Sequence, residues 1–252
     1  MNYVEYGKEN KYDDNIFFQK YSQMSRSQQG LAGAGEWETL RKLLPDFKDK
    51  RVLDLGCGYG WHCIYAMEHG ASSVVGVDIS HKMLEVAKEK THFPQVEYKC
   101  CAIEDVEFPE ESFDVILSSL AFHYVADYEI LVKKIYRILK SGGKLVFTVE
   151  HPVFTAYGTQ DWYYNEKGEI LHFPVDNYYY EGKRTAVFLG EKVTKFHRTL
   201  TTYLNTLLLN GFIINHIVEP QPPEYMMDIP GMQDEMRRPM MLIVSANKKV
   251  DR

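Results

Sequence analysis

A short apolar stretch that runs into three alternating glycines constrains this chain more than any other feature. Residues 51–55 read Arg-Val-Leu-Asp-Leu, and glycine follows at Gly56, Gly58 and Gly60. An apolar run of this length that is bounded by glycine is typical of a buried strand. Because glycine has no side chain and adopts positive φ, such a turn lets backbone atoms approach a ligand closely. The stretch therefore predicts a ligand-binding edge at the carboxyl end of a buried strand.

Strand-like and helix-like segments alternate along most of the chain. Residues 61–69 have a helical pattern that stops at Gly70, residues 73–77 form a second strand that ends at Asp78, and Ser80 is placed to cap the next helix. Further strands are expected at 96–100, 113–118, 144–150, 212–218 and 240–246, and further helices at 36–44, 128–139 (stopped by Ser141-Gly142-Gly143) and 199–209. The alternation predicts an α/β protein with a Rossmann-like, mostly parallel seven-stranded sheet and helices on both faces.

One segment interrupts this alternation after the fifth strand. Residues 151–198 contain short strand-like pieces at 185–189 and 192–196 and a high density of aromatic side chains, namely Phe154, Tyr157, Trp162, Tyr163, Tyr164 and Tyr178–Tyr180. Aromatic walls suit an apolar or planar small molecule, or a cationic amine; alternatively, they form a small core that only stabilises the insertion. We therefore divide the chain into an N-terminal segment (1–35), a core (36–150), an insertion that covers the substrate (151–198) and a completing part of the sheet (199–252).

Composition excludes several classes of protein. The chain has 252 residues and a formal net charge of −6, which disfavours a nucleic-acid-binding protein because such proteins concentrate Lys and Arg. No apolar stretch approaches the roughly 20 residues that a membrane-spanning helix needs. The four cysteines include no C-x-x-C pair, so we expect reduced thiols, no bound metal and a cytoplasmic location. The oligomeric state is left open.

Two classes of ligand fit the glycine turn. A dinucleotide fingerprint would read G-x-G-x-x-G, but the spacing here is G-x-G-x-G. Asp78, at the end of the second strand, is placed to accept two hydrogen bonds from ribose hydroxyls, although it could also serve as a helix cap. These features favour a nucleoside-containing ligand other than a dinucleotide.

Five stretches in order resemble the motifs of the class I S-adenosylmethionine (SAM)-dependent methyltransferases. They are residues 52–60 (VLDLGCGYG), 74–80 (VVGVDIS), 101–114 (CAIEDVEFPEESFD), 118–125 (SSLAFHYV) and 139–147 (LKSGGKLVF). The most similar branch is the small-molecule one that includes the ubiquinone/menaquinone-biosynthesis type. The resemblance implies SAM as the cofactor and methyl transfer to oxygen, nitrogen or carbon of a small molecule. A non-catalytic SAM-binding regulatory protein and, less favoured, a nicotinamide-dependent oxidoreductase are the alternatives.

The resemblance also implies a role for individual residues. Gly56, Cys57 and Gly58 would face the methionine part of the cofactor, Asp54 would orient the turn and the amino group, and Asp78 would hold the ribose. Ile79 and Ile103 would contact the adenine, with Glu104 near its edge. Many relatives carry an acidic residue at the position of Ala102, so the adenine amino group needs another partner here. Ser119 and Leu120 would line the methyl-donor end, and Tyr21 and Arg26 would cover the cofactor from the N-terminal segment.

Methyl transfer from a sulfonium requires alignment of the acceptor more than it requires a catalytic triad. A hydroxyl or acidic acceptor would still benefit from a general base. His123 follows the fourth strand, and His151, next to Glu150, follows the fifth. Both are candidates for this base, and His123 could instead be a packing residue and His151 a loop residue.

Overall fold

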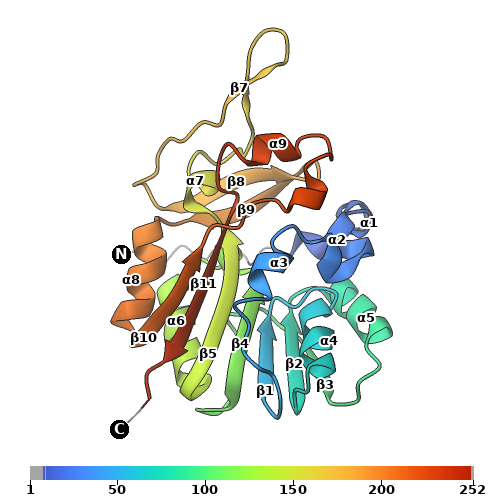
Figure 1. Ribbon diagram of the computed structural model, residues 1–252, viewed down its shortest axis with the longest axis vertical. Helices are drawn as coiled ribbons and strands as arrows, with labels where there is room; N and C mark the ends of the chain where they lie inside the picture. The colour runs from blue at the N-terminus through green and yellow to red at the C-terminus, as the bar shows by residue number, and fades with distance from the viewer. Residues whose placement is uncertain (1–7, 9, 251–252) are drawn as a thin grey trace.

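The computed structural model describes residue 8 and residues 10–250 (Figure 1). Within them, the strands are β1 Arg51–Leu55, β2 Ser73–Asp78, β3 Val96–Cys100, β4 Phe113–Ser119, β5 Leu139–Glu150, β6 Tyr163–Tyr164, β7 Ile170–His172, β8 Gly182–Phe188, β9 Glu191–His197, β10 Phe212–Val218 and β11 Met241–Lys248. The α-helices are α1 Asn15–Ser22, α2 Ser25–Gln28, α3 Trp37–Leu40, α4 Trp61–Glu68, α5 His81–Lys90, α6 Tyr128–Ile138, α7 Pro152–Thr155, α8 Leu200–Leu209 and α9 Met232–Glu235. Short 3-10 turns include η1 Lys11–Asp13 and η3 Phe122–Tyr124.

Seven of these strands form one sheet, in the order β10-β11-β5-β4-β1-β2-β3. The five strands from β5 to β3 in this order run parallel to one another, and β11 is antiparallel to both β5 and β10. The predicted α/β class, with a mostly parallel seven-stranded sheet, is confirmed. Because consecutive parallel strands share an orientation, the carboxyl ends of β1, β2, β4 and β5 meet at one edge.

Side-chain caps fix the beginnings of the longer helices. The side chains of Ser80, Asp127 and Thr199 accept hydrogen bonds from backbone N–H groups in the first turns of α5, α6 and α8. Such caps satisfy N–H groups that have no partner within the helix, and each typically stabilises a helix by about 1 kcal/mol. The predicted cap at Ser80 is therefore present, with its hydroxyl 3.1 Å from the amide of Met83.

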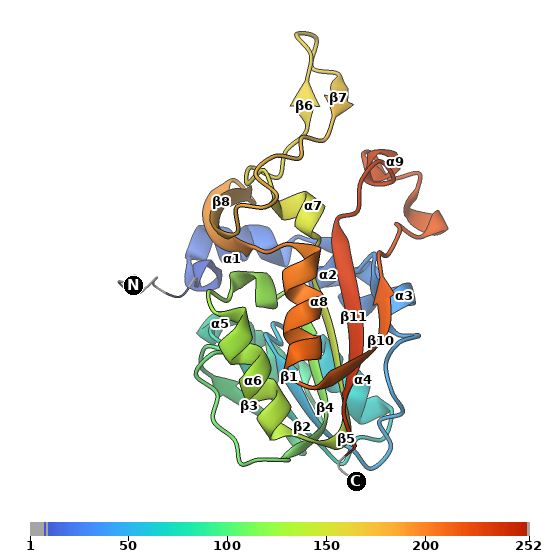
Figure 2. The same ribbon diagram turned by 90° about the vertical axis from the view of Figure 1, so that its left-hand side faces the viewer.

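Two hydrophobic clusters lie on the two faces of the sheet. One joins α6 and α8 to the sheet and includes Leu131, Ile135 and Tyr203. The other joins α3, α4 and α5 and includes Trp37 and Leu84. Figure 2 shows α6 and α8 together on the first of these faces. The predicted helical cover of both faces is confirmed.

The largest differences between the expected and the observed element boundaries occur in two places. The helix expected at 36–44 is limited to α3, and turns follow it up to Pro45. The residues 141–143 do not end helix α6, because the helix stops at Ile138 and β5 already begins at Leu139. Leu139 is fully buried and pairs with Phe113 of β4, but the next pair of this ladder is Val115 with Lys144. The register therefore shifts at residues 140–143, so the two glycines mark an irregularity within β5 rather than the end of a helix.

Segments from both halves of the chain lie above the carboxyl edge of the sheet (Figure 1). They are the N-terminal helices α1 and α2 and the antiparallel hairpin of β8 and β9. A second hairpin, of β6 and β7, projects away from the rest of the molecule (Figures 1 and 2). Among the described residues, no helix is both long and apolar enough to cross a membrane.

Candidate functional site

A cavity of about 230 Å³ opens at the carboxyl edge of the sheet. Of the residues that the sequence predicted for the cofactor, those that line this cavity are Tyr21, Arg26, Gly56, Gly58, Asp78, Ile79, Ala102, Ile103, Glu104, Ser119 and Leu120. They come from residues 11–28 (η1, α1 and α2, called the N-terminal cover below), from the glycine turn and from the loops that follow β2, β3 and β4. The fold thus brings together residues that are spread over a hundred positions of the sequence.

The glycine turn after β1 is held by its neighbours on β2. The amides of Gly56 and Cys57 donate to the carbonyl of Val77 at 2.8 and 2.9 Å, and the amide of Gly58 donates to Asp78 Oδ2 at 2.9 Å. Gly58 has φ +53°, and no atom lies within 4 Å of the position that a Cβ would take. Because Gly58 lines the cavity, its missing side chain leaves room for a ligand against the backbone.

Asp78 links the turn to the start of the next helix. Its Oδ1 accepts the amide of Ser80 at 2.9 Å, while Oδ2 accepts that of Gly58. Burial raises the pKa of this carboxyl above its usual value. A carboxylate offers about four lone-pair sites, so two backbone bonds leave capacity for two further donors. Asp78 lines the cavity, and neighbouring ribose hydroxyls are donors of this kind.

Asp54 lies beneath the turn and does not reach the cavity. It is 1% exposed, and the thiol of Cys63 in α4 lies 3.5 Å from Oδ2. Burial raises the pKa of Asp54 to about 7. The structure therefore contradicts the expected contact between Asp54 and a cofactor amino group, because Asp54 contacts helix α4 instead. Cys57 lines a smaller adjoining cavity of about 80 Å³ that also includes Arg26 and Gly58.

The side of the cavity next to β3 is mainly apolar. Ile79, Met83, Ala102 and Ile103 line it, and Ala102 offers no side-chain acceptor for an amino group. Glu104 also lines the cavity, and burial raises the pKa of its carboxyl. An apolar slot with one acidic residue at its rim suits a planar heterocycle.

The N-terminal cover contributes two of the predicted residues. Arg26 is fixed by Glu36, whose two carboxylate oxygens each lie 3.0 Å from Nη2. Tyr21 packs edge-on against Tyr12 and Tyr59, with ring centroids 5.2 and 5.8 Å apart. Arg26 therefore uses Nη2 to bind Glu36, and the N–H groups on Nε and Nη1 remain as donors for a ligand.

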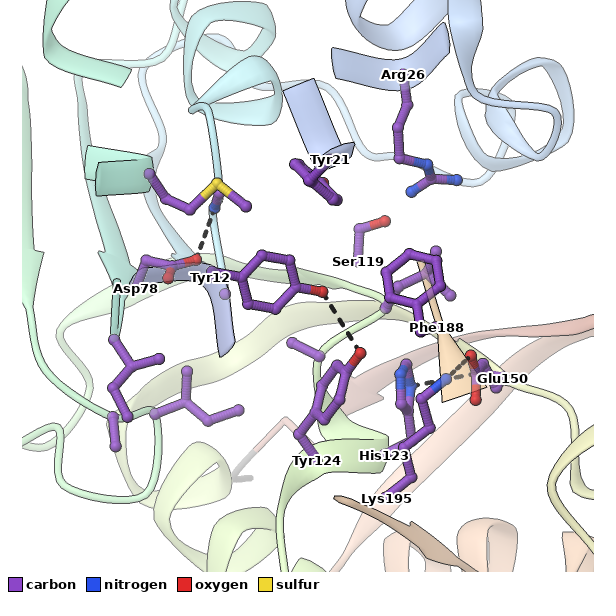
Figure 3. A pocket seen from close by; sticks show the side chains of 18 of the residues that line it. Tyr12, Tyr21, Arg26, Asp78, Ser119, His123, Tyr124, Glu150, Phe188 and Lys195 are labelled. Atoms are coloured by element: carbon purple, nitrogen blue, oxygen red, sulfur yellow. Dashed lines mark hydrogen bonds and ion pairs between the residues drawn. The ribbon is translucent and has the colours of Figure 1, made fainter. Parts of the chain in front are cut away.

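Polar and aromatic side chains gather at the far end of the cavity, across from Asp78 (Figure 3). Lys195 Nζ lies 2.5 Å from Glu150 Oε1 and 2.9 Å from Gln160 Oε1. The amide of Gln160 in turn donates to Glu150 Oε2 at 2.6 Å. Tyr12 and Tyr124, whose hydroxyls are 3.4 Å apart, lie between this group and Asp78 in the view of Figure 3.

His123 lines the same end of the cavity and is 2% exposed. Its Nδ1 lies 3.4 Å from the backbone N–H of Glu150, which makes Nδ1 the acceptor and places the proton of the neutral ring on Nε2. Burial lowers the pKa of His123 to about 4, although Glu150 opposes this shift. In this arrangement His123 offers an N–H donor, and a role as general base would require the opposite tautomer.

The structure does not bring His151 to the cavity. Its Nδ1 accepts the amide of Val153 at 3.1 Å and so caps α7, and its Nε2 lies 2.8 Å from a carboxylate oxygen of Glu219. His151 was expected to be a candidate catalytic base, but in the structure it is a capping residue of α7. The reason is that β5 continues through Glu150, which turns Glu150 rather than His151 toward the cavity.

Most aromatic residues of the insertion also lie away from the cavity. Phe154, Trp162 and Phe173 pack around the guanidinium of Arg238, which is 4.5 to 5.1 Å from their ring centroids. Tyr179 and Tyr180 are 88% and 75% exposed. Of the insertion, only Phe188 and Lys195 from the β8–β9 hairpin reach the cavity, so the alternative of an aromatic mini-core applies to much of this segment.

Sequence reasoning missed Tyr12, Met24, Tyr124, Phe188 and Lys195 as cavity residues. The sequence contained only a partial signal for Lys195: it alternates with Val193 and His197 in a strand-like segment, and the structure shows all three to be buried. A lysine on the buried face of a strand requires a partner. Nothing local identified Glu150, 45 residues earlier, as that partner. Among the described residues, no group of three potential metal ligands is present.

Known proteins with similar sequences and structures define the family. Residues 53–147 match a family described as "Methyltransferase domain". The chain is 58% identical to a "putative S-adenosylmethionine dependent methyltransferase" from Listeria monocytogenes, with a TM-score of 0.84 and coverage of 87% of this chain and 99% of that one. It is 41% identical to an S-adenosylmethionine dependent methyltransferase from Mesorhizobium loti, with a TM-score of 0.80 and coverage of 86% and 100%.

A third similarity concerns only part of the chain. The ubiquinone biosynthesis O-methyltransferase of Coxiella burnetii is 36% identical over 112 residues, which are 44% of this chain and 47% of that enzyme. The two structural relatives, by contrast, are matched over nearly their whole length. The chain therefore belongs to the class I SAM-dependent methyltransferases, with SAM as the cofactor. This finding excludes the alternative of a nicotinamide-dependent oxidoreductase.

Proposed function

We propose that this methyltransferase transfers the methyl group of SAM to a small-molecule acceptor. One observation carries the proposal: a single cavity contains a nucleoside-type site around Gly58 and Asp78 and, at its other end, a polar and aromatic group around Glu150. A methyl donor and a methyl acceptor must share one enclosed space for an in-line displacement. The O-methyltransferase of ubiquinone biosynthesis, similar over the core, supports an acceptor of low molecular weight.

The residues of the cavity fit SAM. The open space above Gly58 accepts the methionine part, the remaining acceptor sites of Asp78 suit ribose hydroxyls, and the apolar residues near Ile103 suit adenine. When bound, SAM supplies an electrophilic methyl group on a positively charged sulfur. We assign the chain itself the tasks of orienting the acceptor and excluding water from it.

The covering segments favour a small acceptor over a macromolecule. Tyr12 and Met24 come from the N-terminal cover and Phe188 and Lys195 from the β8–β9 hairpin, and all four line the cavity. The two covers are packed on each other through Phe17, Ala186 and Val193. A folded protein or duplex could not reach the far end of the cavity beneath these segments, whereas a single ring could.

Calorimetry with SAM and with its demethylated product tests this function, together with transfer of a labelled methyl group. Both ligands should bind, and Asp78→Ala should weaken their binding by about tenfold to a hundredfold, because hydrogen bonds to a charged group contribute roughly 1.5–3 kcal/mol. Asp127→Ala is the matched control, because Asp127 is an exposed aspartate that caps α6 outside the cavity. Folded protein that binds neither ligand would refute the proposal, and transfer of the labelled methyl group to a small molecule would exclude a purely regulatory protein.

A further inference from the structure

The far end of the cavity holds a buried pair of opposite charges that methyl transfer itself does not require. Lys195 is 3% exposed and the Glu150 side chain 15%, and the two atoms that face each other are 2.5 Å apart. The pair joins β5 of the core sheet to β9 of the covering hairpin. Taking two charges out of water is costly, and replacing such a pair by apolar residues is often neutral or stabilising. Stability alone therefore does not explain why both charges border a ligand cavity.

The pair keeps unused hydrogen-bonding capacity. Lys195 Nζ donates to Glu150 and to Gln160, which leaves one of its three N–H groups. Each oxygen of Glu150 accepts one bond, from Lys195 and from Gln160, which leaves one lone-pair site on each. The cavity therefore has a cationic donor and an anionic acceptor side by side, with the Nε2–H of His123 as a neighbouring donor.

The two charges restrict the acceptor that fits beside them. A protonated amine would be attracted by Glu150 but repelled by Lys195, and a carboxylate would be attracted by Lys195 but repelled by Glu150, so the pair favours neither charge. A neutral hydroxyl satisfies both residues, because it donates its hydrogen to the carboxylate and accepts from the ammonium. The rings of Tyr124 and Phe188 lie 5.9 and 5.5 Å from Lys195 Nζ and provide flat apolar walls.

Resting on the function proposed above, we propose that Glu150 and Lys195 bind the acceptor, and that the acceptor is a hydroxyl on a planar ring. The acceptor oxygen forms a bond to the methyl carbon while the carbon–sulfur bond breaks, and the electron pair of that bond stays on sulfur as a neutral thioether. The hydroxyl proton passes to the carboxylate of Glu150. Lys195 stabilises the negative charge that develops on the oxygen before the new bond is complete.

The electrostatics of Glu150 agree with this assignment. Burial by itself raises the pKa of its carboxyl, but the neighbouring His123 and Lys195 and the Gln160 amide outweigh burial and lower the pKa below its usual value. Glu150 is therefore an ionised acceptor at neutral pH. The hydroxyl proton becomes acidic as the oxygen shares its electrons with the methyl carbon, so a weak base in contact with it is sufficient.

Three compounds that share a nitrobenzene ring and differ in one group test the proposal: 4-nitrophenol, 4-nitrobenzoate and 4-nitrobenzylamine. Each is titrated into the protein saturated with the demethylated cofactor. We expect 4-nitrophenol to bind at least tenfold more tightly than the other two and to be the one that is methylated when SAM is supplied. A preference for the acid or the amine, equal binding of all three, or no binding of 4-nitrophenol would overturn the inference. Failure of the cofactor to bind would instead overturn the proposed function.

Variants separate recognition from structure, because the visible absorbance of 4-nitrophenolate reports the pKa of the bound probe. Lys195→Met should raise that pKa by at least one unit, and Glu150→Gln should lower it, since the remaining lysine then favours the phenolate. Lys192→Met, on the exposed side of the same strand, should change neither pKa nor affinity. If the single variants do not fold, the double variant Glu150→Gln/Lys195→Met removes both charges, and it should lose the preference for the phenol. Retained preference in the double variant, or equal pKa values in all folded variants, would overturn the inference.

Discussion

At the scale of single residues, Gly58 combines a backbone requirement with a ligand requirement. Alanine at φ +53° is strained by roughly 1–2 kcal/mol, and its methyl group would also enter the cavity. We expect Gly58→Ala to lower the affinity for the demethylated cofactor at least tenfold, measured by calorimetry. Gly168, with φ +79° and equally free space around it, lies in the projecting hairpin outside the cavity. Gly168→Ala should therefore lose stability only, and an equal loss of affinity in both variants would contradict the role of Gly58.

Asp54 gives a prediction about pH. Its pKa is about 7 in the folded protein because burial penalises the charged form, and about 3.9 is usual for an unfolded chain. Between these values the folded state holds a proton that the unfolded state has released, so the free energy of unfolding falls as the pH rises. Asp54→Asn removes this dependence and should gain up to about 4 kcal/mol over the parent at pH above 7, but not at about pH 4. Urea denaturation of the parent and of Asp54→Asn, at about pH 4 and at pH above 7, measures this difference in the free energy of unfolding. A gain in stability that is the same at both pH values would contradict the prediction.

Most of the cavity residues that were predicted from the sequence belong to local motifs. Gly56, Gly58 and Asp78 lie at strand ends whose positions follow from the strand pattern, and the parallel sheet brings strand ends together. Glu150 and Lys195 could not be paired in this way, because their contact depends on how the β8–β9 hairpin docks on the sheet. Hairpin docking is set by packing between distant segments, which leaves no periodic signal in the sequence.

At the scale of elements, helix α1 and the β8–β9 hairpin behave as one cover. Phe17 is fully buried between them, with its ring 5.7 Å from Phe188 and 5.1 Å from Tyr12. Large-to-small substitutions of buried aromatic residues cost about 3–5 kcal/mol, here from a cluster that is separate from the main core. We expect Phe17→Ala to increase hydrogen exchange in α1 and in both strands of the hairpin. Ile16→Ala, at a neighbouring position that is 60% exposed, should not have this effect, and faster exchange in α1 alone would show that the two elements open independently.

The elements themselves were largely predictable because most of them carry strong periodicity. The strands β3 and β10 agree with the expected bounds, whereas the one-turn helix α3 falls short of its expected length. In β5, Leu139 already pairs with β4, and the register of the ladder shifts at the glycines 142 and 143. The early start of β5 follows the burial of Leu139 in the sheet, as expected when tertiary contacts dominate propensity.

At the scale of the whole molecule, three hydrophobic clusters of unequal size imply unequal stability. Two of them share the strands of the central sheet and should unfold together. The third, around Phe17, Ala186 and Val193, holds only the cover. Local opening is easiest where few apolar contacts are buried, so the cover should exchange its amide hydrogens well before the sheet does.

A ligand in the cavity would touch both parts, since Asp78 belongs to the sheet edge and Phe188 to the cover. Ligand at a hundred times its dissociation constant stabilises the folded state by about 2.7 kcal/mol, which corresponds to a rise in Tm of roughly 5–10 °C for a chain of this size. We expect the demethylated cofactor to raise the Tm by this amount and to slow hydrogen exchange in the β8–β9 hairpin toward that of the sheet. The same ligand concentration should raise the Tm of Gly58→Ala less. A normal rise in Tm without slower exchange in the hairpin would show that the cover does not close on the cofactor, because a ligand stabilises only the segments whose opening it prevents.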